Sequence, residues 1–151
     1  MAVPTQPFPL SRKLPPTLAS IQQYWKTLIR SENLMPFSDD VNLSRLPELS
    51  ANLMLIDVFA GPQRFRFNYL GESIVRMLDS DITEKFADEL EVRSPFNYFV
   101  AQASTTVEAQ APTLYSSSSA IGGKTRGRSY LRIMFPTWGN GRVDLLLGAI
   151  V

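Results

Sequence analysis

The sequence predicts an α+β fold built on an antiparallel sheet, and two observations lead to this class. Segments with strand character fall into two groups, at 53–70 and 113–151, while helical patterns precede the first group and fill the gap between the two. Strands that are grouped in this way, instead of alternating singly with helices, are typical of antiparallel sheets. With 151 residues, the chain has the usual size of one domain.

Residues 1–16 hold five prolines, so we expect them to form a flexible proline-rich arm ahead of a single domain at 17–151. The arm lacks the apolar region of a secretory signal. No apolar run in the chain approaches the roughly 20 residues that cross a bilayer. We therefore expect a cytoplasmic protein that does not contact a membrane.

Two residue types, cysteine and histidine, do not occur in the sequence. Their absence excludes disulfides, thiolate zinc sites, cysteine nucleophiles, histidine-based catalytic triads and histidine-ligated haem. The 15 basic and 14 acidic residues leave a net charge of +1. This balance provides no overall field that would attract nucleic acid, so we expect no nucleic-acid partner.

The first predicted element is a helix that follows Pro15 and Pro16 and ends near Arg30, with Thr17 as its cap. Its apolar residues recur with helical spacing and form one stripe, which comprises Leu18, Ile21, Trp25, Leu28 and Ile29. Such a stripe packs against the sheet of its own chain or against a partner, and both possibilities stay open at this point. For a partner, the expected contact surface is Trp25, Leu28 and Ile29.

Two strand-like runs follow, the apolar LMLIDVF at 53–59 and the alternating RFRFNYL at 64–70, and we expect an antiparallel hairpin. In the second run Phe65, Phe67 and Tyr69 share one face. Rings interleaved with basic residues can form a surface on which nucleic-acid bases stack, or a half-buried strand with a solvated back. Because Phe65 occupies a position where an RNA-recognition strand needs glycine, and the net charge is near zero, we expect the rings to face a core.

Helical patterns occupy the middle of the chain. Residues 74–78 suggest a short helix, and DITE at 81–84 has the form of a capping box. Ser94 and Pro95 are suited to begin a helix that Pro112 ends. This helix is the clearest amphipathic segment, and its apolar stripe comprises Phe96, Phe99, Val100, Ala103 and Val107.

Three more strands are predicted after this helix, at 113–121, 128–135 and 143–151. Gly122 and Gly123 mark a turn between the first two. The sequence WGNGR at 138–142 is a strong hairpin turn, because glycine and asparagine tolerate positive φ. The basic cluster KTRGR at 124–128 flanks the first turn, where solvated charges are usual.

Asp57 interrupts an apolar strand and is the most conspicuous carboxylate of the chain. A buried carboxylate must be paired or hydrogen-bonded, or its pKa rises. We expect Asp57 to lie on the solvated face of its strand instead. The methionine and aromatic residues could line an apolar pocket, although such residues more often form the core.

In the order of its elements and in several short stretches, the sequence resembles the PAS domain, and more narrowly the single-domain PAS proteins of alphaproteobacteria. The stretches are YWKTLIR (24–30), MPFSDDVNL and LPEL (35–49), LMLIDV (53–58), FRFNYLG (65–71), SDIT (80–83) and LRIMFP…GRVDLLLG (131–148). The chain departs from the family at Asn68, where a basic residue is usual, and at Glu72, where a threonine is usual. It also has Asp79, Ser80 and Glu84 in place of the first glycine, the arginine and the last glycine of the family motif Gly-Arg-Asp-Leu-Thr-Gly.

The resemblance implies a PAS-like five-stranded antiparallel sheet, with helices between its second and third strands and an N-terminal helix. It implies a non-catalytic sensory or signalling module that acts by protein–protein interaction, as a homodimer or with signalling proteins such as sensor kinases. PAS domains attach light-sensing flavin and coumaroyl groups through cysteine and usually ligate haem through histidine, so we expect none of these cofactors here. A small apolar ligand without a covalent bond stays possible, and its expected site comprises Phe67, Tyr69, Tyr98, Phe99 and Met134.

An alternative from another class is a small cone-shaped α+β enzyme or ligand carrier that uses Asp57 and tyrosine side chains in a pocket. A purely structural subunit is a third alternative. Activity that is lost in Asp57→Asn would favour the enzyme, whereas capture of a partner without turnover would favour the signalling module.

Overall fold

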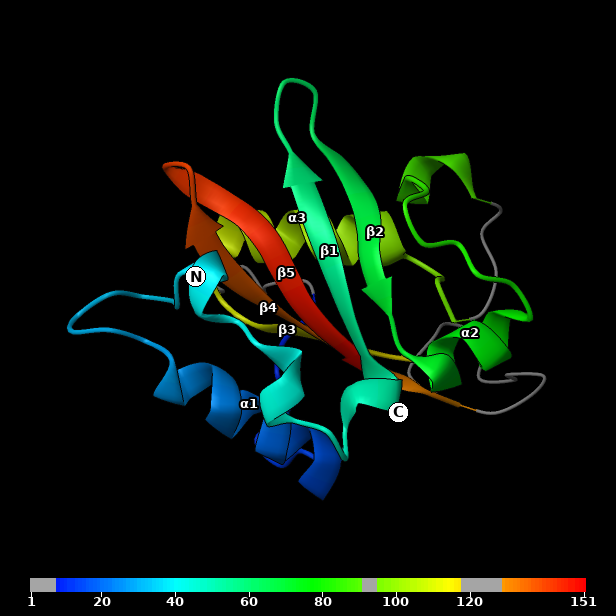
Figure 1. Cartoon of the computed structure of the whole chain (residues 1–151), viewed down its shortest axis with the longest axis horizontal. Coiled ribbons are helices and arrows are strands. Elements are labelled where there is room, and N and C mark those ends of the chain that lie inside the picture. The colour runs from blue at the N-terminus through cyan, green and yellow to red at the C-terminus, as the bar shows by residue number, and fades with distance from the viewer. Residues whose placement is uncertain (1–7, 91–94, 118–128) are drawn as a thin grey trace, which may run out of the picture.

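The structure is a computed structural model that describes residues 8–90, 95–117 and 129–151 (Figure 1). In these ranges the α-helices are α1 (Pro16–Thr27), α2 (Glu72–Leu78) and α3 (Phe99–Ala109). The strands are β1 (Leu53–Phe59), β2 (Arg64–Leu70), β3 (Thr113–Ser116), β4 (Leu131–Gly139) and β5 (Arg142–Ile150). Single turns of 3-10 helix are η1 (Ser38–Asp40), η2 (Leu43–Arg45), η3 (Ser50–Asn52) and η4 (Ala87–Glu89).

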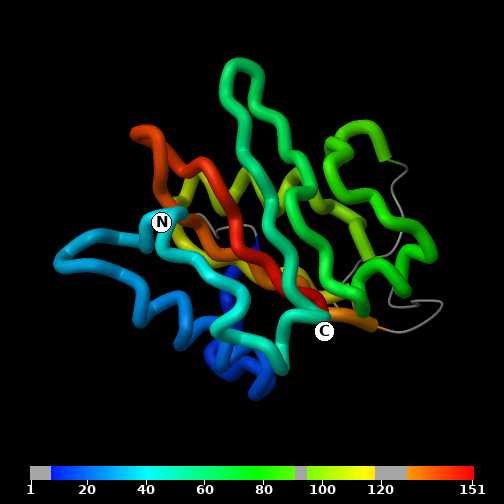
Figure 2. Tube along the Cα trace, viewed as in Figure 1, coloured from blue at the N-terminus to red at the C-terminus, as the bar shows by residue number. Residues whose placement is uncertain are grey.

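The five strands form one antiparallel sheet in the order β2-β1-β5-β4-β3. Arg132 of β4 bonds to Gln102 of α3, whereas the ring of Phe135 lies against Trp25 of α1. Because residues an odd number of positions apart in a strand point to opposite faces, α3 and α1 cover opposite faces of the sheet. Figures 1 and 2 show α3 behind the sheet in this view. The α+β class and the five-stranded antiparallel sheet predicted from the sequence are confirmed.

The predicted hairpin is also confirmed, because β1 and β2 pair in antiparallel register over the predicted ranges. Phe65 and Phe67 are 2% and 1% exposed. Arg66 and Asn68, which alternate with them, point to the other face. Tyr69 is half-buried, and its hydroxyl donates to the carbonyl of Ser50 at 3.1 Å. Both phenylalanine rings therefore belong to the core and offer no surface on which bases could stack.

The predicted N-terminal helix is present, but its ends differ from the prediction. Pro15 occupies the N-cap position and no side chain caps the helix, so the prediction that Thr17 is the cap is wrong. Pro16 begins the helix, where a missing N–H costs no hydrogen bond. The helix ends at Thr27, before the predicted Arg30. Its buried face comprises Leu18, Ile21 and Trp25.

The capping box predicted at 81–84 does not form. Asp81 instead accepts hydrogen bonds from the backbone N–H of Thr83 (3.0 Å) and from its hydroxyl (2.5 Å), and so closes a local turn. Glu84 then adopts a left-handed conformation with a φ of 71°. The single turn η4 follows in place of a longer helix.

The amphipathic helix α3 begins later than predicted. Tyr98 occupies its N-cap position in a left-handed conformation, with a φ of 58°, so Phe96 precedes the helix instead of lying on its stripe. The helix ends where Gln110 is again left-handed, two residues before Pro112. Ser94, the predicted cap, lies outside the described residues.

β4 begins and ends later than the strand predicted at 128–135, because it starts at Leu131 and continues through Pro136 to Gly139. Proline is tolerated there because β3 pairs with β4 only as far as Met134, so no neighbouring strand needs the N–H that proline lacks. The carbonyl of Pro136 accepts the indole N–H of Trp25 at 2.9 Å. The predicted hairpin turn is confirmed, since Asn140 and Gly141 have φ values of 53° and 76°, as a two-residue turn of this kind requires.

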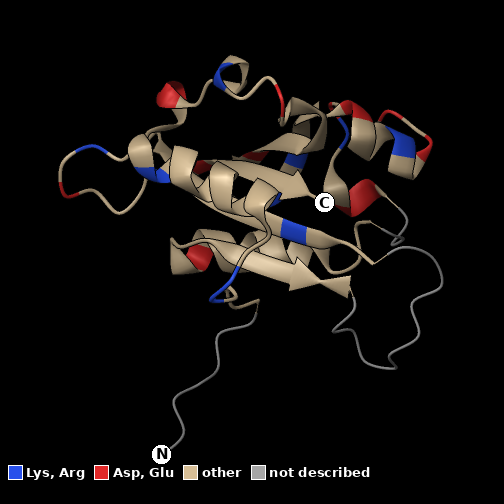
Figure 3. Ribbon diagram, turned by 90° about the horizontal axis from the view of Figure 1, so that it is seen from below, with Lys and Arg blue, Asp and Glu red and all other residues tan. Residues whose placement is uncertain are grey.

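The described part of the predicted arm contacts β3, where the N–H of Leu114 donates to the carbonyl of Phe8 (3.0 Å) and the rings of Phe8 and Tyr115 are 6.2 Å apart. In the described part of the strand predicted at 113–121, β3 ends at Ser116, and residues 118–121 lie outside the described residues. The turn at Gly122 and Gly123 and the basic cluster at 124–128 lie outside the described residues. Figure 3 shows basic and acidic residues interspersed over the described chain.

Candidate functional site

An aromatic cavity lies beside β2 and α3. Alternation along β2 directs Phe67 toward α3, where its ring centroid is 5.2 Å from that of Phe96 and 5.1 Å from that of Phe99. The cavity beside these rings has a volume of about 130 Å³. Its walls are apolar apart from one phenol, and the lining residues are Phe67, Ala87, Leu90, Phe96, Tyr98, Phe99, Val100 and Ala101.

The structure brings together three of the five predicted ligand-site residues. Phe67, Phe99 and Tyr98 line the aromatic cavity, and Tyr98 is 63% exposed, so its ring stands at the solvent side. Met134 is fully buried in β4 and does not line the cavity. Tyr69 does not line it either, because its hydroxyl bonds to the chain ahead of β1. That any of the five binds a ligand stays a prediction.

A buried arginine of β4 anchors one wall of the aromatic cavity. Arg132 is 0% exposed. Its Nη1 donates to the carbonyl of Pro95 at 2.8 Å, and its Nη2 to the carbonyl of Asn97 at 2.7 Å. Its Nε donates to Oε1 of Gln102 at 2.7 Å. Because Pro95 and Asn97 flank Phe96, the guanidinium fixes the segment that carries one ring of the cavity.

Gln102 of α3 extends this network to β3. Its Nε2 donates to the hydroxyl of Thr113 at 3.1 Å and to the carbonyl of Arg132 at 3.0 Å. The hydroxyls of Thr106 and Thr113 are 2.6 Å apart, and all three residues are 0% exposed. Among the described residues, no buried side-chain nitrogen or oxygen lacks a partner, so the network is complete. Sequence reasoning missed this entire group.

Burial and aromatic rings set the electrostatics of the guanidinium. Desolvation lowers the pKa of Arg132 to about 10, against the opposing effect of Tyr130 and Tyr115. The cation lies over the rings of Phe99 (5.2 Å) and Tyr115 (4.9 Å), which stabilise it. Desolvation also raises the pKa of Tyr130 to about 12. Within the described ranges no carboxylate pairs with Arg132, so neutral oxygens and rings alone solvate the charge.

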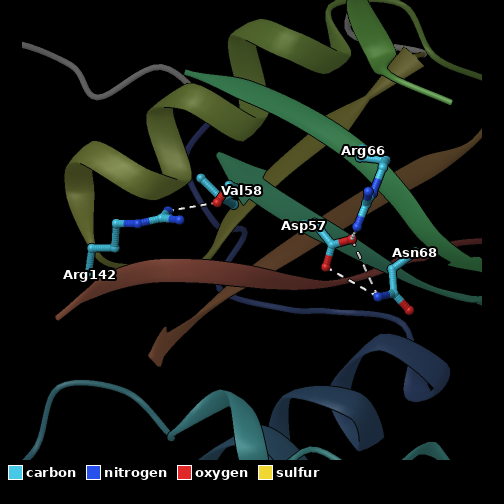
Figure 4. Close-up of polar contacts among 5 residues, drawn as sticks. All are labelled: Asp57, Val58, Arg66, Asn68 and Arg142. Carbon is cyan, nitrogen blue, oxygen red and sulfur yellow. Dashed lines mark hydrogen bonds and ion pairs between the residues drawn. The ribbon is translucent and has the colours of Figure 1, made fainter. Parts of the chain in front are cut away.

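Asp57 lies outside the aromatic cavity. Its side chain points to the face of β1 opposite to that of the buried Val58. Its carboxylate accepts hydrogen bonds from Nη2 of Arg66 at 3.0 Å and from Nδ2 of Asn68 at 3.2 Å (Figure 4). The side chain is 20% exposed. No tyrosine is among its partners in the described chain, so the arrangement that the enzyme alternative would use is not assembled around Asp57.

The predicted interaction residues separate into two environments. Trp25 is 5% exposed, and its ring centroid is 5.4 Å from that of Phe135 in its own sheet. Leu28 and Ile29 lie just past the end of α1 and are half-buried. Both line a surface cavity of about 660 Å³, and Arg30 lines it as well. Their role in association stays a prediction.

No protein-family model matches the chain, and a search of curated proteins found no match. In the described residues, no three or more potential metal-ligating side chains lie together. Nor does any helix in the described part of the chain combine the length and apolarity that a membrane span requires.

Proposed function

We propose that the chain is a non-catalytic sensory module of the PAS type, which acts in the cytoplasm by contact with a second copy of itself or with a signalling protein such as a sensor kinase. Its aromatic cavity accepts a small apolar ligand without a covalent bond. One observation carries the proposal. The sheet has five antiparallel strands, and α2, η4 and α3 are all inserted between the second and the third, as the sequence resemblance implies.

Arg132 supplies a route from the cavity to the sheet. A ligand that enlarges the cavity of about 130 Å³ displaces Phe96, and with it the carbonyls of Pro95 and Asn97 that Arg132 holds. The same guanidinium bonds to α3 through Gln102. Ligand binding therefore changes the position of β4 relative to α3, and a partner that contacts the sheet responds to this change.

Native mass spectrometry of the purified protein tests the ligand. We expect a bound small molecule that is released on denaturation. Ala101→Trp, which fills the cavity, should abolish its binding, whereas Ala109→Trp, at the far end of the same helix, should retain it. If both variants and the wild type carry no small molecule, or all carry it equally, the aromatic cavity is not the ligand site.

Sedimentation tests the partner half of the proposal. Because Trp25 is buried in its own chain, Leu28 and Ile29 form the remaining contact surface. The double variant Leu28→Glu, Ile29→Glu should be a folded monomer where the wild type is a dimer, and Lys26→Glu, an exposed change of charge on α1, should remain a dimer. If the wild type is monomeric at every concentration reached, self-association through this surface is wrong. If the double variant unfolds, both residues belong to the core.

A further inference from the structure

The two hairpins of the sheet separate at their outer ends. β1 and β5 pair only as far as Asp57 and Leu145, and beyond these residues each strand keeps only its own hairpin partner. Figure 1 shows the tips of the β1–β2 and β4–β5 hairpins pointing apart. The space between them, which we call the hairpin cleft, has a volume of about 410 Å³. Its walls include Val58, Val107, Gln110, Trp138, Arg142 and Val143.

The hairpin cleft has the size and the walls of a small-molecule site. Ligand pockets commonly measure about 300–1,000 Å³ and combine apolar walls with a few fixed polar groups. Val58 and Val143 are each 4% exposed and form the floor with Val107 of α3, while Trp138 contributes an indole. Arg142 supplies the charged group.

Among the described residues, Arg142 is held at the cleft wall through Nη1 alone. Its Nη1 donates to the carbonyl of Val58 at 2.6 Å (Figure 4). The same nitrogen donates to the carbonyl of Val143 at 3.2 Å. Because the pairing of β1 with β5 ends before Val58, the carbonyl of Val58 has no partner in β5, and the guanidinium donates to it instead. Joining the two hairpins in this way requires no more than Nη1.

The opposite edge of the guanidinium, formed by Nε and Nη2, has no acceptor among the described residues. Elsewhere in the chain this edge binds carboxylates: Arg30 donates from Nε and Nη2 to the two oxygens of Asp40, and Arg64 does the same to Asp88. Since no buried side-chain nitrogen of the described residues lacks a partner, the open edge of Arg142 is accessible to solvent. A planar carboxylate is the group that this edge binds best.

We propose that the hairpin cleft binds an amphiphilic carboxylate, such as a medium-chain fatty acid. The carboxylate accepts both hydrogen bonds from Nε and Nη2 of Arg142, and the apolar body lies against Val107, Trp138 and Val143. This site is separate from the aromatic cavity and does not depend on the proposed signalling function.

Two-dimensional amide NMR with octanoate as the probe tests the proposal on the intact protein. The chain has two tryptophans, so its spectrum contains two indole N–H signals, which Trp138→Phe assigns. Octanoate should shift the signal of Trp138 in a saturable manner and leave that of Trp25, which is bonded to Pro136, in place. Octanamide has the same shape without the charge and should bind about tenfold more weakly, or worse.

The variants distinguish two roles of Arg142, which are binding of a carboxylate and a purely structural link between the two hairpins. In Arg142→Gln, octanoate should bind no better than octanamide, while Arg142→Lys should retain part of the preference. Arg76→Gln, which removes a surface arginine distant from the cleft, should behave as the wild type. Val107→Trp fills the cleft and should abolish binding of both probes.

Three results would overturn the proposal. The first is equal affinity of the wild type for octanoate and octanamide, or no saturable shift with either. The second is wild-type affinity for octanoate in Arg142→Gln. The third is tighter binding of octyl phosphate than of octanoate, which would assign the site to a phosphate. Should Arg142→Gln fail to fold, Arg142→Lys and Val107→Trp decide between the same outcomes.

Discussion

Removing the ring of Phe67 tests the assignment of β2 to the core. Burying a phenylalanine stabilises a fold by about 1.5–3 kcal/mol, and each ring pair adds about 0.5–1.5 kcal/mol. Phe67 is 1% exposed and forms two such pairs, with Phe96 and Phe99. We therefore expect Phe67→Ala to lower the free energy of unfolding by about 3–5 kcal/mol, in line with other buried phenylalanines.

Urea denaturation followed by tryptophan fluorescence measures this loss, with Trp25 as the buried reporter. Asn68→Ala is the matched control, because Asn68 follows Phe67 on the exposed face of the same strand, and it should cost less than about 1 kcal/mol. A loss below about 1 kcal/mol for Phe67→Ala would mean that the ring is exposed. Base stacking on β2 would then have to be considered again.

Three further predictions concern the buried network and cofactors. Arg132→Lys keeps the charge but cannot donate to Gln102, Pro95 and Asn97 together. Because each acceptor left unpaired costs about 1–3 kcal/mol, urea denaturation should show that the free energy of unfolding falls by about 3 kcal/mol or more. Burial raises the pKa of Tyr130 to about 12, so the last step in a tyrosinate absorbance titration should vanish in Tyr130→Phe. The folded state retains this proton longer than the unfolded state, so the wild type should lose stability relative to Tyr130→Phe between about pH 10 and pH 12. Because the chain contains no cysteine or histidine, the purified protein should show neither a Soret band nor a flavin spectrum that survives denaturation and desalting.

Local patterns predicted the strands better than the helix ends. The β1–β2 hairpin and the Asn140-Gly141 turn followed directly from alternation and turn chemistry, because both depend on neighbouring residues alone. The capping box predicted at 81–84 does not form because Asp81 instead accepts a hydrogen bond from the N–H of Thr83, and the sequence DITE is compatible with both arrangements. The late start of α3 could not be predicted, because it depends on the left-handed Tyr98, a conformation that tyrosine rarely adopts.

The candidate sites were harder to predict than the fold. Three residues of the aromatic cavity were expected, since rings are a direct signal for apolar sites. Arg132 was not expected. Alternation along a strand distinguishes buried from exposed positions only when one face of the sheet is solvated, and both faces of β4 are covered. Arg142 follows a turn, where charged residues are usually exposed, and its role depends on where the pairing of β1 with β5 ends.

α3 connects the two proposed sites. Its first turn carries Phe99 and Ala101 in the wall of the aromatic cavity, and Val107 near its other end lines the hairpin cleft. A rigid helix shared in this way couples two sites only if it has two positions that each ligand favours differently. If it does, the factor by which an apolar ligand changes the affinity for octanoate must equal the factor by which octanoate changes the affinity for that ligand. Because the two factors are equal whichever element carries the coupling, the decisive observation is whether they differ from one, and a factor of one would mean that α3 does not couple the two sites.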